Sequence, residues 1–109
     1  MDFKVFLSDE ALRDLERIVG YIAPHNALAA EQMGDQLLDA ALSLRTFPER
    51  GRIVPEFRQP ELREIVFRSY RIIYRTNNTD QSLEIVRFWH GARGFPHIPA
   101  GGGRPESAG

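Results

Sequence analysis

The side chains best suited to chemistry gather in one short segment, RFWHGARG, which spans residues 87–94. It holds Arg87, the only tryptophan (Trp89), His90 and Arg93. Guanidinium groups bind carboxylates and phosphates through paired hydrogen bonds, and an imidazole exchanges protons near neutral pH. Catalysis, contact with nucleic acid, binding of a protein partner and simple packing in the core could each explain this cluster.

Arg71 and Arg75 are two of the four arginines in the preceding segment, LREIVFRSYRIIYR, which spans residues 62–75. Side chains alternate between the two faces of an extended chain, so both arginines should point to the same face. At least one arginine from each of the last two predicted strands should then lie on a sheet surface that no helix covers. The candidate surface for binding another macromolecule comprises Arg71, Arg75, Arg87, Trp89, His90 and Arg93.

The same alternation assigns faces in the last predicted strand, residues 83–90. It places Ile85, Arg87 and Trp89 on one face. Val86 lies on the other face, together with the residues two positions before and two positions after it. Neither face is purely polar, so the pattern does not indicate which of them is buried.

Two helices with apolar stripes are predicted in the first half of the chain, after a short strand over residues 3–7. Ser8 can cap the first helix, which has acidic residues in its first turn and ends at Pro24. Asn26 can cap the second helix, which runs to about Arg45. Because so short a link separates them, the helices should form an antiparallel hairpin.

A loop and then three strands are predicted in the second half. Prolines and a glycine interrupt residues 47–60, because a helix interior or a central strand needs the N–H donor that proline lacks. Segments rich in β-branched and aromatic residues follow and should pair as an antiparallel meander: 62–67, 70–75 and 83–90. The expected fold is α+β with two layers, in the order β-α-α-β-β-β. The N-terminal strand and the helical hairpin pack on an antiparallel sheet whose other face stays open.

Length and composition limit the class of protein. A chain of 109 residues, 42% hydrophobic and 27% charged, fits one soluble domain over residues 1–98 and a disordered tail over 99–109. No apolar run approaches the roughly 20 residues that cross a bilayer. The start lacks a secretory signal pattern, and there is no cysteine. We expect a cytoplasmic protein without membrane contact, cofactor or metal, since its three histidines form no recognised ligand spacing.

The net charge of -1 conceals an uneven distribution of charged residues. Residues 1–44 carry three basic and eight acidic side chains, whereas residues 45–93 carry ten arginines and six acidic side chains. Arginine suits bidentate contact with a carboxylate or phosphate better than lysine does. An acidic partner for the second half, or simple neutralisation of one half by the other, would each explain the asymmetry.

Two of these patterns, with the order of elements, resemble the RelE/ParE superfamily of toxins from bacterial type II toxin–antitoxin modules. A strand reading Tyr-Arg-hydrophobic-hydrophobic-Tyr (70–74) precedes a strand that ends in His-Gly-Ala-Arg (90–93). This combination is similar to the ParE-like branch, and the resemblance covers about residues 3–95. It implies a toxin held inactive by a cognate antitoxin, in a hetero-oligomer. ParE-like members are understood to poison DNA gyrase, whereas RelE-like members cut messenger RNA on the ribosome.

The two branches require different chemistry. A ribonuclease needs a proton acceptor, cations that stabilise the phosphate, and usually an acid. The resemblance places Arg71 and Arg93 where RelE-like enzymes carry catalytic arginines, and His90 could be an acid. However, the lysines of those enzymes align with Glu64 and Val66, and their C-terminal tyrosine has no counterpart.

We therefore predict a ParE-like toxin that binds DNA gyrase and performs no covalent chemistry of its own. The alternative is a RelE-like, metal-independent mRNA endonuclease that acts on the ribosome through Arg71, His90 and Arg93. A third possibility is a member that only binds its antitoxin and represses their operon.

Each candidate residue also has a purely structural interpretation. Trp89 could be a core or interface anchor, because aromatic side chains near strand ends usually pack. Arg71 could simply pair with Glu64 on the neighbouring strand. We expect Phe88 and Trp89 to pack, and the polar groups at the sheet edge to come from Arg87, His90 and Arg93.

Overall fold

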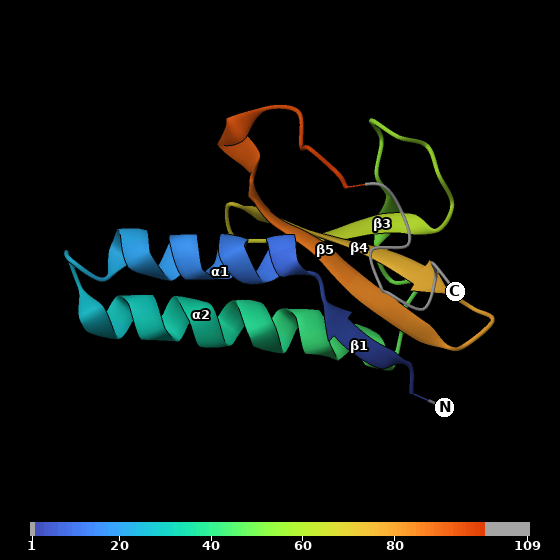
Figure 1. Ribbon diagram of the computed structural model, residues 1–109, viewed down its shortest axis with the longest axis horizontal. Helices are drawn as coiled ribbons and strands as arrows, with labels where there is room; N and C mark the ends of the chain where they lie inside the picture. Colours follow the sequence, from blue (N-terminus) through green and yellow to red (C-terminus); the bar gives the residue numbers. More distant parts are fainter. Residues whose placement is uncertain (1, 100–109) are drawn as a thin grey trace.

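Two helices lie against a five-stranded sheet in the computed structural model, which describes residues 2–99 (Figure 1). The helices are α1 (Asp9–Ile22) and α2 (Ala27–Leu42). The strands are β1 (Lys4–Leu7), β2 (Arg52–Ile53), β3 (Leu62–Phe67), β4 (Tyr70–Asn77) and β5 (Ser82–His90). Single 3-10 turns follow α2 (Ser43–Arg45) and β5 (Gly91–Arg93).

The strand order across the sheet is β1-β5-β4-β3-β2. The antiparallel meander of β3, β4 and β5 was predicted and is confirmed. The sheet as a whole is mixed, however, because β1 pairs with β5 in parallel. The two-residue strand β2, which lies inside the predicted loop, pairs with β3.

The helical hairpin is confirmed, and both predicted capping residues act as N-caps. The hydroxyl of Ser8 accepts a hydrogen bond from the Ala11 N–H at 3.0 Å, and the amide oxygen of Asn26 accepts one from the Ala29 N–H at 2.9 Å. Each bond satisfies one of the N–H groups that a helix leaves without a partner at its start. The first helix ends at Ile22, two residues before Pro24.

The main hydrophobic core fills the space between the helices and one face of the sheet. Buried side chains of both helices meet those of β4 and β5 there, and Tyr74 and Phe88 are the largest. The core residues are Ala11, Leu37, Ala41, Leu44, Ile72, Tyr74, Leu83, Ile85 and Phe88.

A β-bulge interrupts the alternation of side chains in β5. Ile73 pairs with Arg87 and the next residue, Tyr74, pairs with Ile85, so Val86 is one extra residue in β5. Ile85 therefore faces the helices while Trp89 faces away from them. The prediction that these two residues share a face was wrong, because strict alternation holds only in a strand without a bulge.

The other face of the sheet is covered over much of its area. A second core of Val54, Leu62, Ile73, Val86 and Trp89 lies on it, and Phe57 and Ile98 pack against this core. The covering residues come from the loop before β3 and from the segment after the last 3-10 turn. The prediction of an open face was therefore wrong: these segments carry the apolar side chains that cover it.

Within residues 2–99, neither helix combines the length and the apolar character that crossing a bilayer would require. The predicted disorder of the tail concerns residues that, apart from Pro99, lie outside the described part of the chain.

Candidate functional site

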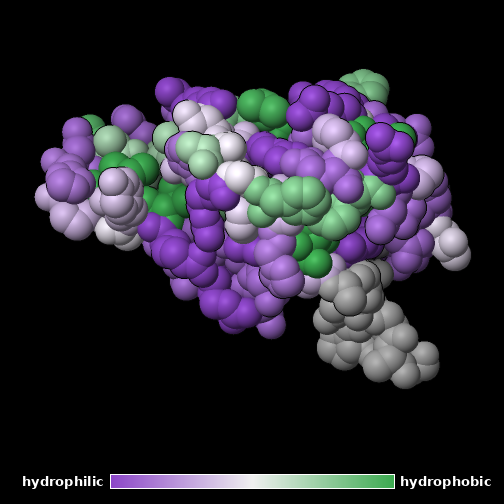
Figure 2. All heavy atoms as spheres, turned by 90° about the horizontal axis from the view of Figure 1, so that it is seen from above, coloured by the Kyte–Doolittle hydropathy of each residue, from purple (hydrophilic) through white to green (hydrophobic). Residues whose placement is uncertain are grey.

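A groove of about 390 Å³ lies between α1 and the neighbouring ends of β4 and β5. Seen from above, strongly hydrophobic atoms are exposed on the helical part of the molecule, among hydrophilic residues (Figure 2). Tyr21, on α1 at the groove, is 79% exposed. Apolar floors with a few polar groups are typical of binding sites. The groove is lined by Asp14, Arg17, Ile18, Tyr21, Ile22, Tyr70, Phe88, His90 and Arg93.

His90 lies in this groove with its ring set edge-on against Tyr70, at 5.1 Å between ring centroids. Its Nδ1 accepts a hydrogen bond from the Ala92 N–H at 3.1 Å, which caps the 3-10 turn. The imidazole thus already uses the nitrogen with which a neutral ring, protonated at Nε2, would accept a proton. Burial raises the pKa of the Tyr70 hydroxyl, so this group stays protonated at neutral pH.

Arg93 is exposed at the rim of the groove and rests on Trp89, with its guanidinium carbon 4.2 Å from the ring centroid. Trp89 is only 5% exposed, and its indole N–H donates to the Gly94 carbonyl at 3.1 Å. Trp89 therefore packs, as predicted. It gives Arg93 a fixed platform through a cation–π contact.

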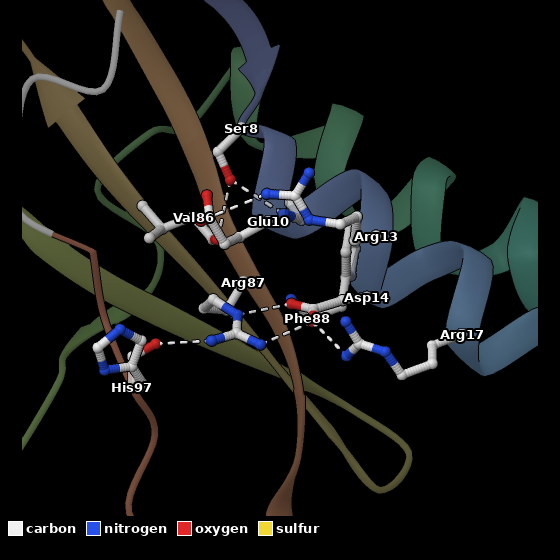
Figure 3. A network of polar contacts seen from close by, with 10 residues as sticks. Ser8, Glu10, Arg13, Asp14, Arg17, Val86, Arg87, Phe88 and His97 are labelled. Atoms are coloured by element: carbon white, nitrogen blue, oxygen red, sulfur yellow. Dashed lines mark hydrogen bonds and ion pairs between the residues drawn. The ribbon is translucent and has the colours of Figure 1, made fainter.

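Arg87 is buried instead of lying exposed at the sheet edge as predicted (Figure 3). Its Nε and Nη2 each donate to the Asp14 carboxylate at 2.7 Å, and its Nη1 donates to the His97 carbonyl at 2.8 Å. The hydrogen bonds with Asp14 raise the pKa of the Arg87 guanidinium. Because all these donors are engaged within the molecule, Arg87 is a poor candidate for direct contact with a partner.

Asp14, the partner of Arg87, was missed in the sequence. Besides Arg87, its carboxylate accepts hydrogen bonds from the Phe88 N–H at 3.1 Å and from Arg17 at 3.3 Å. The signal that could have identified it is its position three residues after the buried Ala11, in the apolar stripe of α1. An acidic side chain at such a position needs a buried cation or several donors.

A second group of charged residues surrounds Arg71 on the face away from the helices. The Arg71 Nε donates to the Glu64 carboxylate at 2.6 Å, and its two terminal nitrogens donate to Glu56 at 2.9 and 2.7 Å. The Glu56 hydrogen bonds raise the pKa of Arg71, and the same bonds lower the pKa of Glu56. Arg52 binds the second oxygen of Glu64 at 2.7 Å. The expected contact of Arg71 with Glu64 is thus present, but Glu56 was not anticipated.

Arg75, the last of the predicted residues, lies on the same face as Arg71. Its guanidinium is 4.0 Å from the Glu84 carboxylate and donates to the Pro99 carbonyl at 3.4 Å. These contacts hold Arg75 between Glu84 of β5 and the backbone of Pro99.

The sheet separates the predicted residues into two groups. Arg71 lies opposite Trp89 in the β4–β5 pairing, and Tyr70 lies opposite His90. Neighbouring residues of a strand point to opposite faces, so Arg71 and His90 lie on different sides of the sheet. His90 lines the groove beside α1, whereas Arg71, Arg75 and Trp89 lie on the far face of the sheet, away from the helices. Arg93 lines the groove and also rests on Trp89.

Across residues 2–99, no three histidine, cysteine, aspartate or glutamate side chains are grouped so that they could hold a metal ion.

Solved structures with the same arrangement define the fold. The toxin–antitoxin complex RelBE2 from Mycobacterium tuberculosis is similar with a TM-score of 0.64, over 83% of this chain and 99% of that one, at 19% identity. The chromosomal ParDE toxin–antitoxin system from P. aeruginosa is similar with a TM-score of 0.68, over 81% and 95%, at 14% identity. The chain thus has the fold of RelE/ParE-type toxins, as predicted.

Sequence comparisons show the family. The family model described as the ParE toxin of the type II toxin–antitoxin system parDE matches residues 5–95. Toxin RelE1 of Caulobacter vibrioides is 36% identical over 94 residues, which cover 84% of this chain and 96% of that protein. Toxin RelE2 of the same organism is 41% identical over 83 residues, or 76% and 89%. The chain therefore belongs to the ParE toxin family and is a type II toxin of the RelE/ParE superfamily.

Proposed function

We propose that this toxin inhibits growth by binding DNA gyrase, without a covalent step of its own, and that a cognate antitoxin neutralises it. The observation that carries this proposal is the placement of Arg71 and His90 on opposite faces of the sheet. Groups on different sides of a sheet are poorly placed to act together on one phosphate. The chain matches the ParE family model, and gyrase is the target that the resemblance to ParE-like members implies.

Proton transfer is the second difficulty for a nuclease. A base must take the proton from the attacking hydroxyl group. The only carboxylate that lines the groove within residues 2–99 is Asp14, and it already accepts hydrogen bonds from Arg87, Arg17 and Phe88. His90 has committed its accepting nitrogen to Ala92, which removes it as a base and leaves its Nε2–H for the role of acid. These contacts favour a groove that binds another protein over one that cleaves RNA.

The antitoxin is proposed from the structural neighbours and from the groove. Both similar structures are described as toxin–antitoxin systems, which supports a hetero-oligomer. The groove has an apolar floor between two cationic side chains, Arg17 and Arg93. An amphipathic segment with acidic residues beside its apolar stripe would match that surface.

The second candidate function is cleavage of messenger RNA on the ribosome. The names of the relatives, Toxin RelE1 and Toxin RelE2, favour it. In that case Arg93 and His90 would act together in the groove, and Arg71 would contribute only through the far face.

Two assays on the purified protein discriminate between these functions. We expect it to block supercoiling of relaxed plasmid by gyrase, and to leave transcripts on translating ribosomes uncut. Arg93→Ala should weaken gyrase inhibition about tenfold, because truncation of an arginine that a partner buries at an interface costs roughly 1–2 kcal/mol. The matched control is Arg13→Ala, since Arg13 is an exposed arginine of α1 that does not line the groove. Transcript cleavage that disappears in His90→Ala would instead establish the nuclease.

A further inference from the structure

The face of the sheet away from the helices holds the guanidinium group of Arg71, here called the Arg71 fork. This group is fixed in position before any partner binds. The Glu64 side chain is completely buried, and its two oxygens bind Arg71 at 2.6 Å and Arg52 at 2.7 Å. Because Nε of Arg71 is tied to Glu64, its two terminal nitrogens point away from Glu64 as a planar pair. Such a pair matches the two oxygens of a carboxylate.

Glu56 occupies that pair of nitrogens in the free protein. Its oxygens lie 2.9 and 2.7 Å from the terminal nitrogens of Arg71, in a bidentate contact. The guanidinium groups of Arg71 and Arg52 carry two positive charges, and the Glu64 carboxylate carries one negative charge. The Glu56 carboxylate neutralises the positive charge that remains. The Glu56 side chain thus takes the place that an external carboxylate would take.

The Glu56 side chain can leave without movement of its loop. The loop is fixed by other residues: the N–H groups of Phe57 and Arg58 both donate to the Val54 carbonyl, at 3.1 and 3.0 Å. Phe57 also packs against the second core and against Phe95. The Glu56 side chain is 23% exposed, and rotation of an exposed side chain takes only picoseconds to nanoseconds.

The surroundings of the fork suit a protein better than a nucleic acid. Val66, which lies directly opposite Arg71 in the β3–β4 pairing, is 64% exposed and offers an apolar contact beside the fork. The whole chain has a net charge of -1, whereas proteins that track phosphate backbones rely on an excess of basic residues.

We propose that the Arg71 fork binds a carboxylate side chain of a protein partner, and that Glu56 is an internal placeholder which this partner displaces. The inference rests on the proposed function in that the partner is a protein. The charge of Arg71 is paired with Glu56 in the free toxin and with the partner's carboxylate in the complex, so it is never buried without a counter-charge. The fork therefore remains ordered in the free toxin and becomes available on binding.

The test measures binding of a hexaglutamate peptide, with a fluorescein amide at its N-terminus and an amidated C-terminus, by fluorescence anisotropy. Glu56→Gln removes the competing charge and should bind the peptide about tenfold more tightly. The reason is that an ion pair of ordinary strength between Glu56 and Arg71 leaves the terminal nitrogens of Arg71 unoccupied in only about a tenth of the wild-type molecules. The matched control is Glu61→Gln, which changes the net charge equally in the same loop but has no contact with Arg71. We expect it to change the affinity by less than about twofold.

A third variant tests whether the fork itself binds the peptide. Adding Arg71→Lys to Glu56→Gln should abolish the gain, since an ammonium group keeps the charge but lacks the paired donors. An equal gain in Glu61→Gln, no gain in Glu56→Gln, or a larger gain for hexauridylate RNA than for the peptide would each overturn the proposal. Peptide binding is measured without gyrase, so a failed gyrase assay leaves this result intact.

Discussion

The contact between Asp14 and Arg87 joins residues that are 73 positions apart in the chain. Burial of two charges is unfavourable unless hydrogen bonds compensate for the lost water. Here the carboxylate accepts from Arg87, Arg17 and the Phe88 N–H, and Arg87 also binds the His97 carbonyl (Figure 3). One ion pair thus connects α1, β5 and the C-terminal segment beside the groove.

Removing one partner of this pair should destabilise the fold strongly. Asp14→Asn leaves the Arg87 charge buried without its counter-charge, and we expect the free energy of unfolding to fall by about 3 kcal/mol or more. Urea denaturation at pH 7 measures the change. Asp35→Asn is the matched control, because Asp35 is an exposed aspartate of α2, and it should stay within about 0.5 kcal/mol of the wild type. Equal stability of the two variants would contradict the structural role of Asp14.

At the level of elements, Ser8 connects β1, α1 and the bulge of β5. Its N–H donates to the Ile85 carbonyl at 2.9 Å, and its hydroxyl donates to the Val86 carbonyl at 3.0 Å while accepting from Ala11. The chain leaves the sheet and begins α1 at this residue. Ser8 therefore sets the direction from which α1 approaches β5, and with it the width of the groove.

The double role of Ser8 predicts a difference between the two helix caps. Ser8→Ala should lower the free energy of unfolding by about 2 kcal/mol, since it removes a cap worth about 1 kcal/mol and also the donor to a carbonyl in β5. Asn26→Ala removes only an exposed cap and should cost about 1 kcal/mol. Thermal unfolding of both variants checks the order, and an equal or reversed effect would show that the contact with Val86 adds no stability.

In the whole molecule, hydrophobic residues cover both faces of the central strands. Ile72 packs toward the helices and Ile73 packs toward the second core, and both are fully buried. The segment after the last 3-10 turn contributes the buried Pro96 and the partly buried Ile98. This segment also supplies the carbonyl that Arg87 binds, so it connects the second core to the ion pair.

Shortening the chain tests this arrangement. A protein that ends at Gly94 loses residues 95–99, and with them the ring contact of Phe95 with Phe57 and the carbonyl groups that accept from Arg87 and Arg75. We expect it to lose about 2–3 kcal/mol of stability from the exposed apolar surface and the missing hydrogen bonds. The fluorescence of Trp89 should also shift to longer wavelength. A protein that ends at Pro99 retains every described contact and is the control. Unchanged stability of the shorter protein would contradict a structural role for this segment.

Much of the fold could be predicted because its signals are local. Helix caps such as Ser8 and Asn26 act within three residues, and apolar periodicity reports which side of an element is buried. Two short patterns around Tyr70 and His90 were sufficient to indicate the superfamily. The burial of Trp89 also followed from its position near a strand end.

The amino-acid sequence by itself determined both helices, every strand except β2, their order along the chain and the family, because those depend on residues that are near one another in the chain. Only the tertiary structure decided that Arg87 is buried on Asp14, that Arg71 is held by Glu56, and that a bulge at Val86 moves Trp89 to the far face. Each of these outcomes depends on which distant side chain satisfies a charge or a backbone group. Local alternation and propensity carry no information about that partner.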